Sequence, residues 1–195
     1  MPEGGERRYA MAVDLGRCTG CWACAVACRA ANGVGEGQGW LTVMTGEGDP
    51  TDVPAGTYPD LALSYYPVGC QHCDDPPCVA VCPTGATYRR ADGIVAMDYA
   101  LCNGCRACIP ACPYGARSYA PPGVGQRGGG VVEKCDFCLG RLEAGRSPAC
   151  VDACAQGART FGDLLDPESD IARLLASRSS VRLMEELGKI GRAHV

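Results

Sequence analysis

Sixteen of the 195 residues are cysteine, and they fall into four groups of four along the chain. The quartets are Cys18, Cys21, Cys24 and Cys28; Cys70, Cys73, Cys78 and Cys82; Cys102, Cys105, Cys108 and Cys112; and Cys135, Cys138, Cys150 and Cys154. Three quartets open with two short gaps and close on Cys-x3-Cys, a spacing typical of bacterial [4Fe-4S] ligation. Because no cysteine is left over, four such clusters are the first hypothesis.

The spacing has a physical reason. A cubane offers four iron corners, and three closely spaced thiolates on one tight loop can bind three of them. In two-cluster ferredoxins the last cysteine of each run binds the other cluster. The quartets are therefore expected to work in pairs.

Two other interpretations use the same residue type. A disulfide scaffold suits a secreted chain rich in cysteine, but these loops are too tightly spaced to bridge without strain. Zinc ribbons also use Cys-x2-Cys pairs, yet a third cysteine in the same loop is surplus to a zinc site. Iron–sulfur ligation is favoured over both.

Composition predicts a thin conventional core. The chain has only two Phe and two Trp, against 27 Gly and 14 Pro, so the clusters must contribute much of the folding energy and the apoprotein is expected to be disordered. The formal net charge is -4, and four oxidised cubanes would bring it to about -12. Nucleic acid is therefore excluded as a partner.

Three basic residues lie beside the cysteines in sequence. Lys134 precedes Cys135, Arg106 follows Cys105, and Arg117 follows the third quartet. Each would raise a cluster potential if it lay close to the cluster, because positive charge stabilises the reduced state. Ordinary solvated surface charge is the alternative.

No stretch approaches the roughly 20 apolar residues that span a bilayer. Arg7-Arg8 is followed by a short strand-like segment containing Asp14 rather than by an apolar region, so no export signal is expected. At the other end, residues 190–195 back-translate as ATC GGA AGA GCA CAC GTC, a widely used sequencing-library adapter. We expect 190–195 to be a non-native tail, which would leave His72 as the only native histidine.

Internal repeats indicate the local structure. The segments 9–14 and 94–98 are predicted strands that lead into cluster loops. A Gly-Ala pair lies three residues beyond Cys82, Cys112 and Cys154, and its glycine would permit the turn back into a strand. Proline after Cys82 and Cys112 would end the helical turn there, whereas the turns at Cys28 and Cys154 are free to continue as helices.

Three further segments fall outside this pattern. Residues 29–69 are predicted to be an irregular surface excursion, and residues 119–130 a mobile linker, because both are punctuated by Gly and Pro. Asp166 is the predicted N-cap of a helix with Pro167 at its first position. That helix would pack Ile171, Leu174 and Leu175 against the core.

Several longer motifs identify a family. They are Cys70-Gln-His-Cys-Asp-Asp-Pro-Pro-Cys78, Cys112-Pro-Tyr-Gly-Ala-Arg117, Lys134-Cys-Asp-Phe-Cys138 with Arg141 and Pro148-Ala-Cys150, and Phe161-Gly-Asp163 with Asp166-Pro167. With them, the chain resembles the iron–sulfur subunit of molybdopterin oxidoreductases of the dimethyl sulfoxide reductase family, which includes polysulfide, thiosulfate and tetrathionate reductases. The resemblance covers nearly everything from Tyr9 to about Gly188.

The resemblance implies an α+β, loop-rich, nested double ferredoxin. Residues 9–64 and 131–189 would form an outer unit, residues 65–120 an inner unit, and residues 121–130 a linker. It also implies four ligand sets for four [4Fe-4S] clusters. These are Cys18, Cys21, Cys24 and Cys154; Cys135, Cys138, Cys150 and Cys28; Cys70, Cys73, Cys78 and Cys112; and Cys102, Cys105, Cys108 and Cys82. Cys105 favours a four-iron cluster in the last set, because nitrate-reductase-like relatives have Trp there.

By the same resemblance, the chain is no enzyme by itself. It would carry electrons between a quinone-reactive membrane anchor subunit and a molybdopterin catalytic subunit in anaerobic respiration. The complex would be peripheral and membrane-associated, on the cytoplasmic face or exported with its catalytic subunit. In this family the first set lies nearest the catalytic subunit and the last nearest the anchor. The alternative is a free-standing soluble polyferredoxin, which would be polar all round.

No catalytic residue is identified. His72 lies inside a cysteine loop, where it would either donate to a cluster sulfur or make a structural contact. Asp74-Asp75 is interpreted as loop structure rather than as a carboxylate pair for acid–base chemistry.

Overall fold

The computed structural model describes residues 6–45, 54–125, 128–184 and 193–194. The strands are β1 (Tyr9–Val13), β2 (Leu41–Thr45), β3 (Ala55–Thr57), β4 (Asp60–Ala62), β5 (Tyr65–Gly69), β6 (Thr87–Arg89), β7 (Val95–Met97), β8 (Ser118–Ala120), β9 (Val131–Glu133), β10 (Arg159–Asp163) and β11 (Ala193–His194). The helices are α1 (Ala23–Asn32), α2 (Pro77–Ala80), α3 (Leu139–Glu143), α4 (Ala149–Asp152) and α5 (Asp170–Ser177). The mixed, loop-rich character predicted from the sequence is confirmed.

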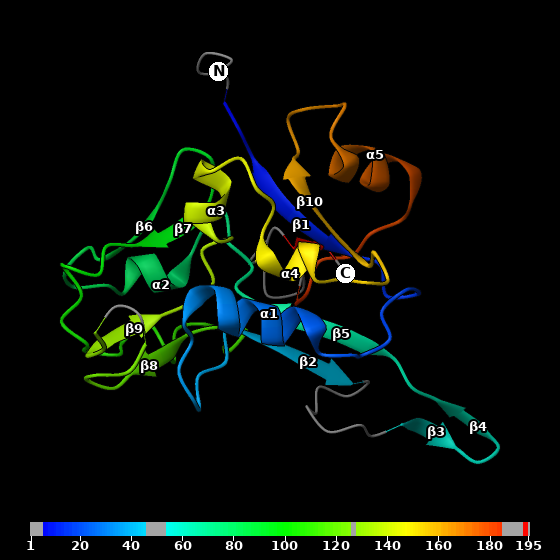
Figure 1. Cartoon of the computed structure of the whole chain (residues 1–195), viewed down its shortest axis with the longest axis horizontal. Coiled ribbons are helices and arrows are strands. Elements are labelled where there is room, and N and C mark those ends of the chain that lie inside the picture. The colour runs from blue at the N-terminus through cyan, green and yellow to red at the C-terminus, as the bar shows by residue number, and fades with distance from the viewer. Residues whose placement is uncertain (1–5, 46–53, 126–127, 185–192, 195) are drawn as a thin grey trace.

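The two ends of the chain meet in one sheet. β1 pairs antiparallel with β10, in a register that joins Tyr9 to Asp163 and Val13 to Arg159, and Figure 1 shows the two strands side by side. β11 pairs parallel with β1 on its other side. The rest of the predicted tail, 190–192 and 195, lies outside the described residues, and its origin stays a prediction.

The predicted strands and Gly-Ala turns are confirmed. β1 and β7 occupy the segments expected to lead into cysteine loops. The glycines of the three turns have φ of 68°, 59° and 57° at Gly85, Gly115 and Gly157, respectively, a conformation that glycine adopts without steric cost. The alanine after each is buried, and β6, β8 or β10 follows directly or one residue later.

The irregular excursion predicted for 29–69 is wrong for most of its described residues. It contains the end of α1 and four strands, and β2 pairs with β5 from Leu41 opposite Gly69 to Thr45 opposite Tyr65. The alternation in β2 buries Val43 and Thr45, so a two-residue period was present among the surrounding glycines. β3 and β4 form a hairpin that projects from the body of the molecule (Figure 1).

Two predicted helix boundaries are also wrong. α5 begins after Ser169, whose hydroxyl accepts a hydrogen bond from the Ala172 backbone N–H and donates to the Asp163 carbonyl. Asp166 instead accepts from the Glu168 N–H in a local turn. The segment at Cys154 does not continue as a helix, because α4 ends at Asp152 and the Gly157 turn follows.

The segment predicted as a linker closes a hairpin. β8 and β9 pair across it from Ser118 opposite Glu133 to Ala120 opposite Val131. Within the loop between the two strands, the Gly123 N–H donates to the Gly128 carbonyl at 2.9 Å. Residues 126–127 lie outside the described residues. β9, the first strand of the outer segment expected at 131–189, therefore pairs with β8, the last strand of the inner unit expected at 65–120.

The described core is divided into small clusters. The largest packs Met11, Val43, Ile94 and Phe137 together with cysteine side chains. A separate one packs Ile171 of α5 against Ala10 and Ala12 of β1, with Leu174 and Leu175 at its edge. The apolar face predicted for this helix is thereby confirmed.

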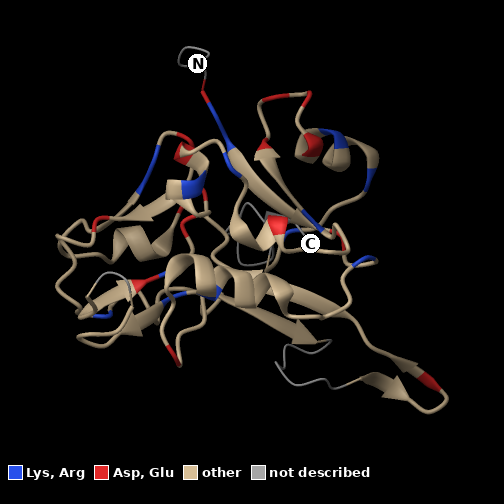
Figure 2. Ribbon diagram, in the orientation of Figure 1, with Lys and Arg blue, Asp and Glu red and all other residues tan. Residues whose placement is uncertain are grey.

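Charged residues lie mainly on loops and helix ends in Figure 2, while β2 and β5 carry none. Within the described ranges, no helix is long and apolar enough to span a bilayer.

Replacing Ile171 with alanine is expected to lower the free energy of unfolding of the cluster-loaded protein by about 2–5 kcal/mol. Ile171 is fully buried and has no cysteine among its core partners, so the change opens a cavity away from the thiols. Chemical denaturation followed by circular dichroism measures the change. Ile171→Val is the matched control, with an expected loss of about 0.5–1.5 kcal/mol. Equal stability of wild type and I171A would contradict the packing described.

Candidate metal centres

All sixteen cysteines lie in the described residues, and all are free thiols. This excludes the disulfide scaffold as the arrangement in this structure. In the described ranges no three His, Cys, Asp or Glu side chains converge on a single metal-ion position. The thiols of at least two groups instead surround hollows.

The first group lies at the start of α1. Cys18, Cys21 and Cys24 line a cavity together with Cys154, which arrives from the loop after α4. The loop curls into α1 through Trp22, whose φ is 61°. Three thiols from one loop and one remote thiol thus surround one space.

The second group lies deeper. Cys28, Cys135, Cys138 and Cys150 line a second cavity. The Asn32 side-chain amide approaches two of these sulfurs, at 3.4 Å from Cys138 Sγ and 3.8 Å from Cys28 Sγ. Burial, followed by the neighbouring Cys150 and Cys138 thiols, raises the pKa of Cys28 to about 12. The last cysteine of the first quartet is therefore grouped with the fourth quartet.

Helix α1 explains how one quartet serves two cavities. Cys24 and Cys28 are one helical turn apart and both are buried, so they share a face of α1. Cys24 lines the first cavity and Cys28 the second. The two cavities are consequently neighbours along one helix.

The third group contains Cys70, Cys73, Cys78 and Cys112. Burial raises the pKa of Cys73 to about 12, and the next largest causes are the nearby thiols of Cys70, Cys78 and Cys112. Cys70 also lines the second cavity, and it contributes to the raised pKa of the partly buried Cys135 thiol. The third group therefore adjoins the second.

The fourth group is described less completely. Cys108 is buried, and its pKa is raised by burial with a smaller contribution from Cys102. Partial burial acts to raise the pKa of Cys82, but hydrogen bonds from Thr87, Thr84 and Ala86 outweigh it and lower this pKa to about 7. The contacts of the described residues do not join Cys82 or Cys105 to this group, and their place in it stays a prediction.

A cavity lined by the four thiols of one set fits a cubane, which takes one thiolate at each of its four separated iron corners. The fifth thiol at the second cavity, Cys70, belongs to the third group. Around the first two cavities, part of the guanidinium of Arg159 is buried without a protein partner. Thiolate and sulfide sulfur accept hydrogen bonds from such donors. The residues present therefore fit [4Fe-4S] clusters.

Two of the three basic residues identified in the sequence are buried. Lys134 is 1 % exposed and Arg117 is 4 % exposed, so surface charge is the wrong interpretation for both. Arg106 is exposed and lies over the Tyr119 ring, 3.7 Å from its centroid. Sequence reasoning missed Arg159, which is 9 % exposed. The available signal was the repeat, because Arg159 follows Gly157-Ala158 as Arg117 follows Gly115-Ala116.

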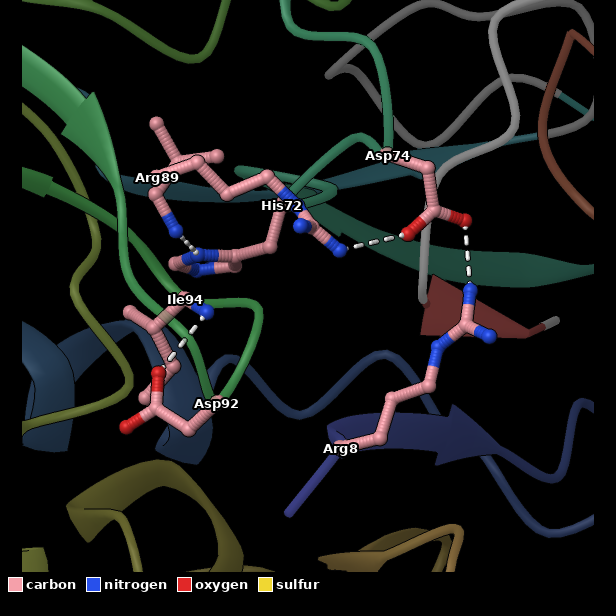
Figure 3. Close-up of polar contacts among 7 residues, drawn as sticks. Arg8, His72, Asp74, Arg89, Asp92 and Ile94 are labelled. Carbon is pink, nitrogen blue, oxygen red and sulfur yellow. Dashed lines mark hydrogen bonds and ion pairs between the residues drawn. The ribbon is translucent and has the colours of Figure 1, made fainter. Parts of the chain in front are cut away.

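His72 makes a structural contact between two cysteine loops. It is fully buried, and its Nδ1 accepts a hydrogen bond from the Val95 N–H at 3.1 Å (Figure 3). Its ring stacks on Phe137 with centroids 3.8 Å apart. His72 lies between Cys70 and Cys73 in sequence, and Phe137 between Cys135 and Cys138, so the stack joins the loops of the second and third groups.

Asp74 contributes to loop structure through two arginines. Its carboxylate accepts from Arg8 at 2.7 Å and from Arg89 at 3.2 Å (Figure 3). Arg8 directly precedes β1 and Arg89 ends β6. These part-exposed ion pairs link the sheet at the chain ends to the middle of the chain.

Known proteins are similar to this chain over most of its length. Residues 61–164, which contain three of the four quartets, match the family model described as a 4Fe-4S dicluster domain. A protein of Halobacterium salinarum, provisionally named as a dimethyl sulfoxide reductase iron–sulfur subunit, is 44 % identical over 92 % of this chain and 75 % of its own length. A subunit of the tetrathionate reductase of Salmonella typhimurium is 42 % identical over 94 % of this chain and 70 % of its own length. A polypeptide of the polysulfide reductase of Wolinella succinogenes is 43 % identical over 93 % and 90 %, respectively.

Proposed function

We propose an electron-transfer function for this chain, which belongs to the family of iron–sulfur subunits of dimethyl sulfoxide reductase-type molybdopterin oxidoreductases. It would carry electrons through four [4Fe-4S] clusters between a quinone-reactive membrane anchor subunit and a molybdopterin catalytic subunit. The bound clusters supply the one-electron redox centres. The chain would hold them close together and set the charge around them.

The ligand sets that we propose are the four that the resemblance implies. The two cavities support the sets of Cys18, Cys21, Cys24 and Cys154, and of Cys28, Cys135, Cys138 and Cys150. The set of Cys70, Cys73, Cys78 and Cys112 is supported by the effect of the other three thiols on Cys73, because each of them, after burial, contributes to its raised pKa. For Cys82, Cys102, Cys105 and Cys108 the proposal rests on the repeat.

We also propose that the chain forms two nested ferredoxin-like units, because the first and fourth quartets contribute cysteines to each other's cavities. The outer unit would comprise 9–64 and 131–189, the inner unit 65–120, with 121–130 between them. Pairing of β1 with β10 joins the two outer segments, and β6 pairs with β7 inside the inner one. The single observation that carries the proposal is that Cys28 of the first quartet lines the second cavity, whereas Cys154 of the fourth quartet lines the first cavity.

Exposed apolar side chains favour a subunit over a free-standing carrier. Val81 and Leu101 are 41 % and 51 % exposed beside the last proposed set. Trp22 and Val26 are exposed beside the first set. Apolar residues at both ends of the proposed cluster chain are expected of faces that contact other subunits. The complex would be peripheral and membrane-associated.

Iron and sulfide analysis of anaerobically purified protein tests the cluster content. We expect about 16 iron and about 16 acid-labile sulfide per chain, with four reducible centres by electron paramagnetic resonance. A content near eight iron, or stoichiometric zinc, would contradict the proposal.

Isolation with a large molybdenum- or tungsten-containing subunit is the expected result of affinity purification from a native host.

Changing Leu101 to aspartate is expected to weaken binding to the membrane anchor at least tenfold. The substitution places a charge on the exposed apolar residue beside Cys102, where a desolvated contact is proposed. Co-purification with the anchor subunit, normalised to iron content, measures the effect. Leu165→Asp is the matched control, because Leu165 is equally exposed, at 52 %, but lies beyond β10. Equal loss in both variants would argue against an interface at Leu101.

A further inference from the structure

The proposed cluster chain contains three junctions between successive cysteine sets, and a buried cation lies at each. The cations are Arg159, Lys134 and Arg117, all 9 % exposed or less. Among the described residues, none of the three forms an ion pair with a carboxylate. Burying an unpaired charge is costly, so its compensation has to come from negative charge of another kind.

Arg159 lies between the first and second sets. It lines both of their cavities, and its Nη2 contacts Met11 Sδ on β1 at 2.7 Å. Its Nε and Nη1 are buried without a protein partner. Burial raises the pKa of the Cys24 and Cys150 thiols, and the next largest cause, the positive charge of Arg159, opposes this rise at both. One guanidinium thus faces a cysteine of each set.

Arg117 repeats this arrangement between the third and fourth sets. Its Nη1 donates to Thr87 Oγ1 at 3.2 Å and approaches Met97 Sδ at 3.3 Å, while Nη2 is buried without a partner. Cys78 and Cys108 pack in one core cluster. Burial raises the pKa of both thiols, and the next largest cause, the positive charge of Arg117, opposes this rise at each of them.

Lys134 lies between the second and third sets. Its Nζ donates to the Cys135 carbonyl at 2.7 Å and to the Val95 carbonyl. Cys135 belongs to the second set, and the Val95 N–H binds His72 in the loop of the third. Burial raises the pKa of the Cys78 thiol, and the positive charge of Lys134 is one of the smaller causes that oppose this rise. The ammonium is therefore held at the place where His72 and Phe137 join the two loops.

We propose that each buried cation is shared by the two clusters that flank it and raises the reduction potentials of both together. This inference rests on the proposed four-cluster function. A fixed charge in a water-poor interior favours the gain of one negative charge nearby, and it does so for both neighbours because it lies between them. A cation at every junction would keep successive potentials close.

The test is a redox titration of the complete, cluster-loaded chain, followed by electron paramagnetic resonance, in three single variants. Arg159→Gln should lower the first and second potentials, Lys134→Gln the second and third, and Arg117→Gln the third and fourth. The equilibrium constant for reduction of each affected centre should fall by about tenfold or more, which equals a fall in potential of about 59 mV for one electron. Overlapping pairs of shifted centres identify the order without prior assignment of the spectra.

Arg106→Gln is the matched control, since Arg106 adjoins Cys105 but is exposed, and solvent screening should leave all four potentials unchanged. Arg117→Lys and Arg159→Lys retain the charge and should retain the potentials. Arg117→Met, Lys134→Met and Arg159→Met, which also remove the charge, replace any Gln variant that fails to assemble and should give the same shifts. Four loaded centres with only one shifted per variant, or with none, would overturn the inference while leaving the proposed function intact. A wild-type protein with fewer than four centres would overturn both.

Discussion

Removal of iron by an anaerobic chelator is expected to abolish the cooperative unfolding transition of this protein. The two main core clusters contain cysteine side chains, Cys24 and Cys150 in one and Cys78 and Cys108 in the other. Without iron, these groups contribute little more than small apolar side chains, and the remaining described core is thin. Binding free energies of about 10–16 kcal/mol for one structural metal ion exceed or equal the whole stability of an ordinary domain.

The measurement is thermal unfolding by far-ultraviolet circular dichroism before and after chelation, with reconstitution by iron and sulfide as the reversal. The iron-free chain should show no sigmoidal transition and a spectrum dominated by disorder. The holoprotein of Ile171→Ala serves as control, because it is destabilised but should keep a cooperative transition. An iron-free chain that unfolds cooperatively near the wild-type temperature would show that side-chain packing alone maintains the fold.

Replacing Cys154 with alanine is expected to alter one cluster, and that cluster is not the one bound by its neighbours in sequence. Cys154 lines the cavity of Cys18, Cys21 and Cys24. Cys138 and Cys150, from its own quartet, line the other cavity. One of the four paramagnetic centres should be lost or converted, and the other three should be retained, because each site has its own loop.

Two double variants identify the affected cluster, since changes within one site are not additive whereas changes at separate sites are. Cys21→Ala with Cys154→Ala should still disturb one centre. Cys138→Ala with Cys154→Ala should disturb two. The reverse result, one centre for the Cys138 pair and two for the Cys21 pair, would mean that the quartets do not exchange ligands and would remove the nested arrangement.

Much of the local structure follows from the sequence. The strand segments before the first and third quartets and the Gly-Ala turns after Cys82, Cys112 and Cys154 were predictable because each depends on a few adjacent residues. Where the prediction failed, distant contacts decided the outcome. Ser169 begins α5 because its hydroxyl also reaches the Asp163 carbonyl. β2 and β5 form because they have each other as partners across 19 residues of intervening chain.

The sequence by itself determined the number of cysteines, their division into quartets and the kind of cofactor, because cysteine spacing within a loop is a short-range property of the chain. Only the tertiary structure decided which remote cysteine enters which cavity, since that depends on α1 and α4 being packed side by side. It also decided that Lys134, Arg117 and Arg159 are buried whereas Arg106 is exposed. Burial of a charge depends on everything packed around it, and its immediate sequence neighbours do not encode that.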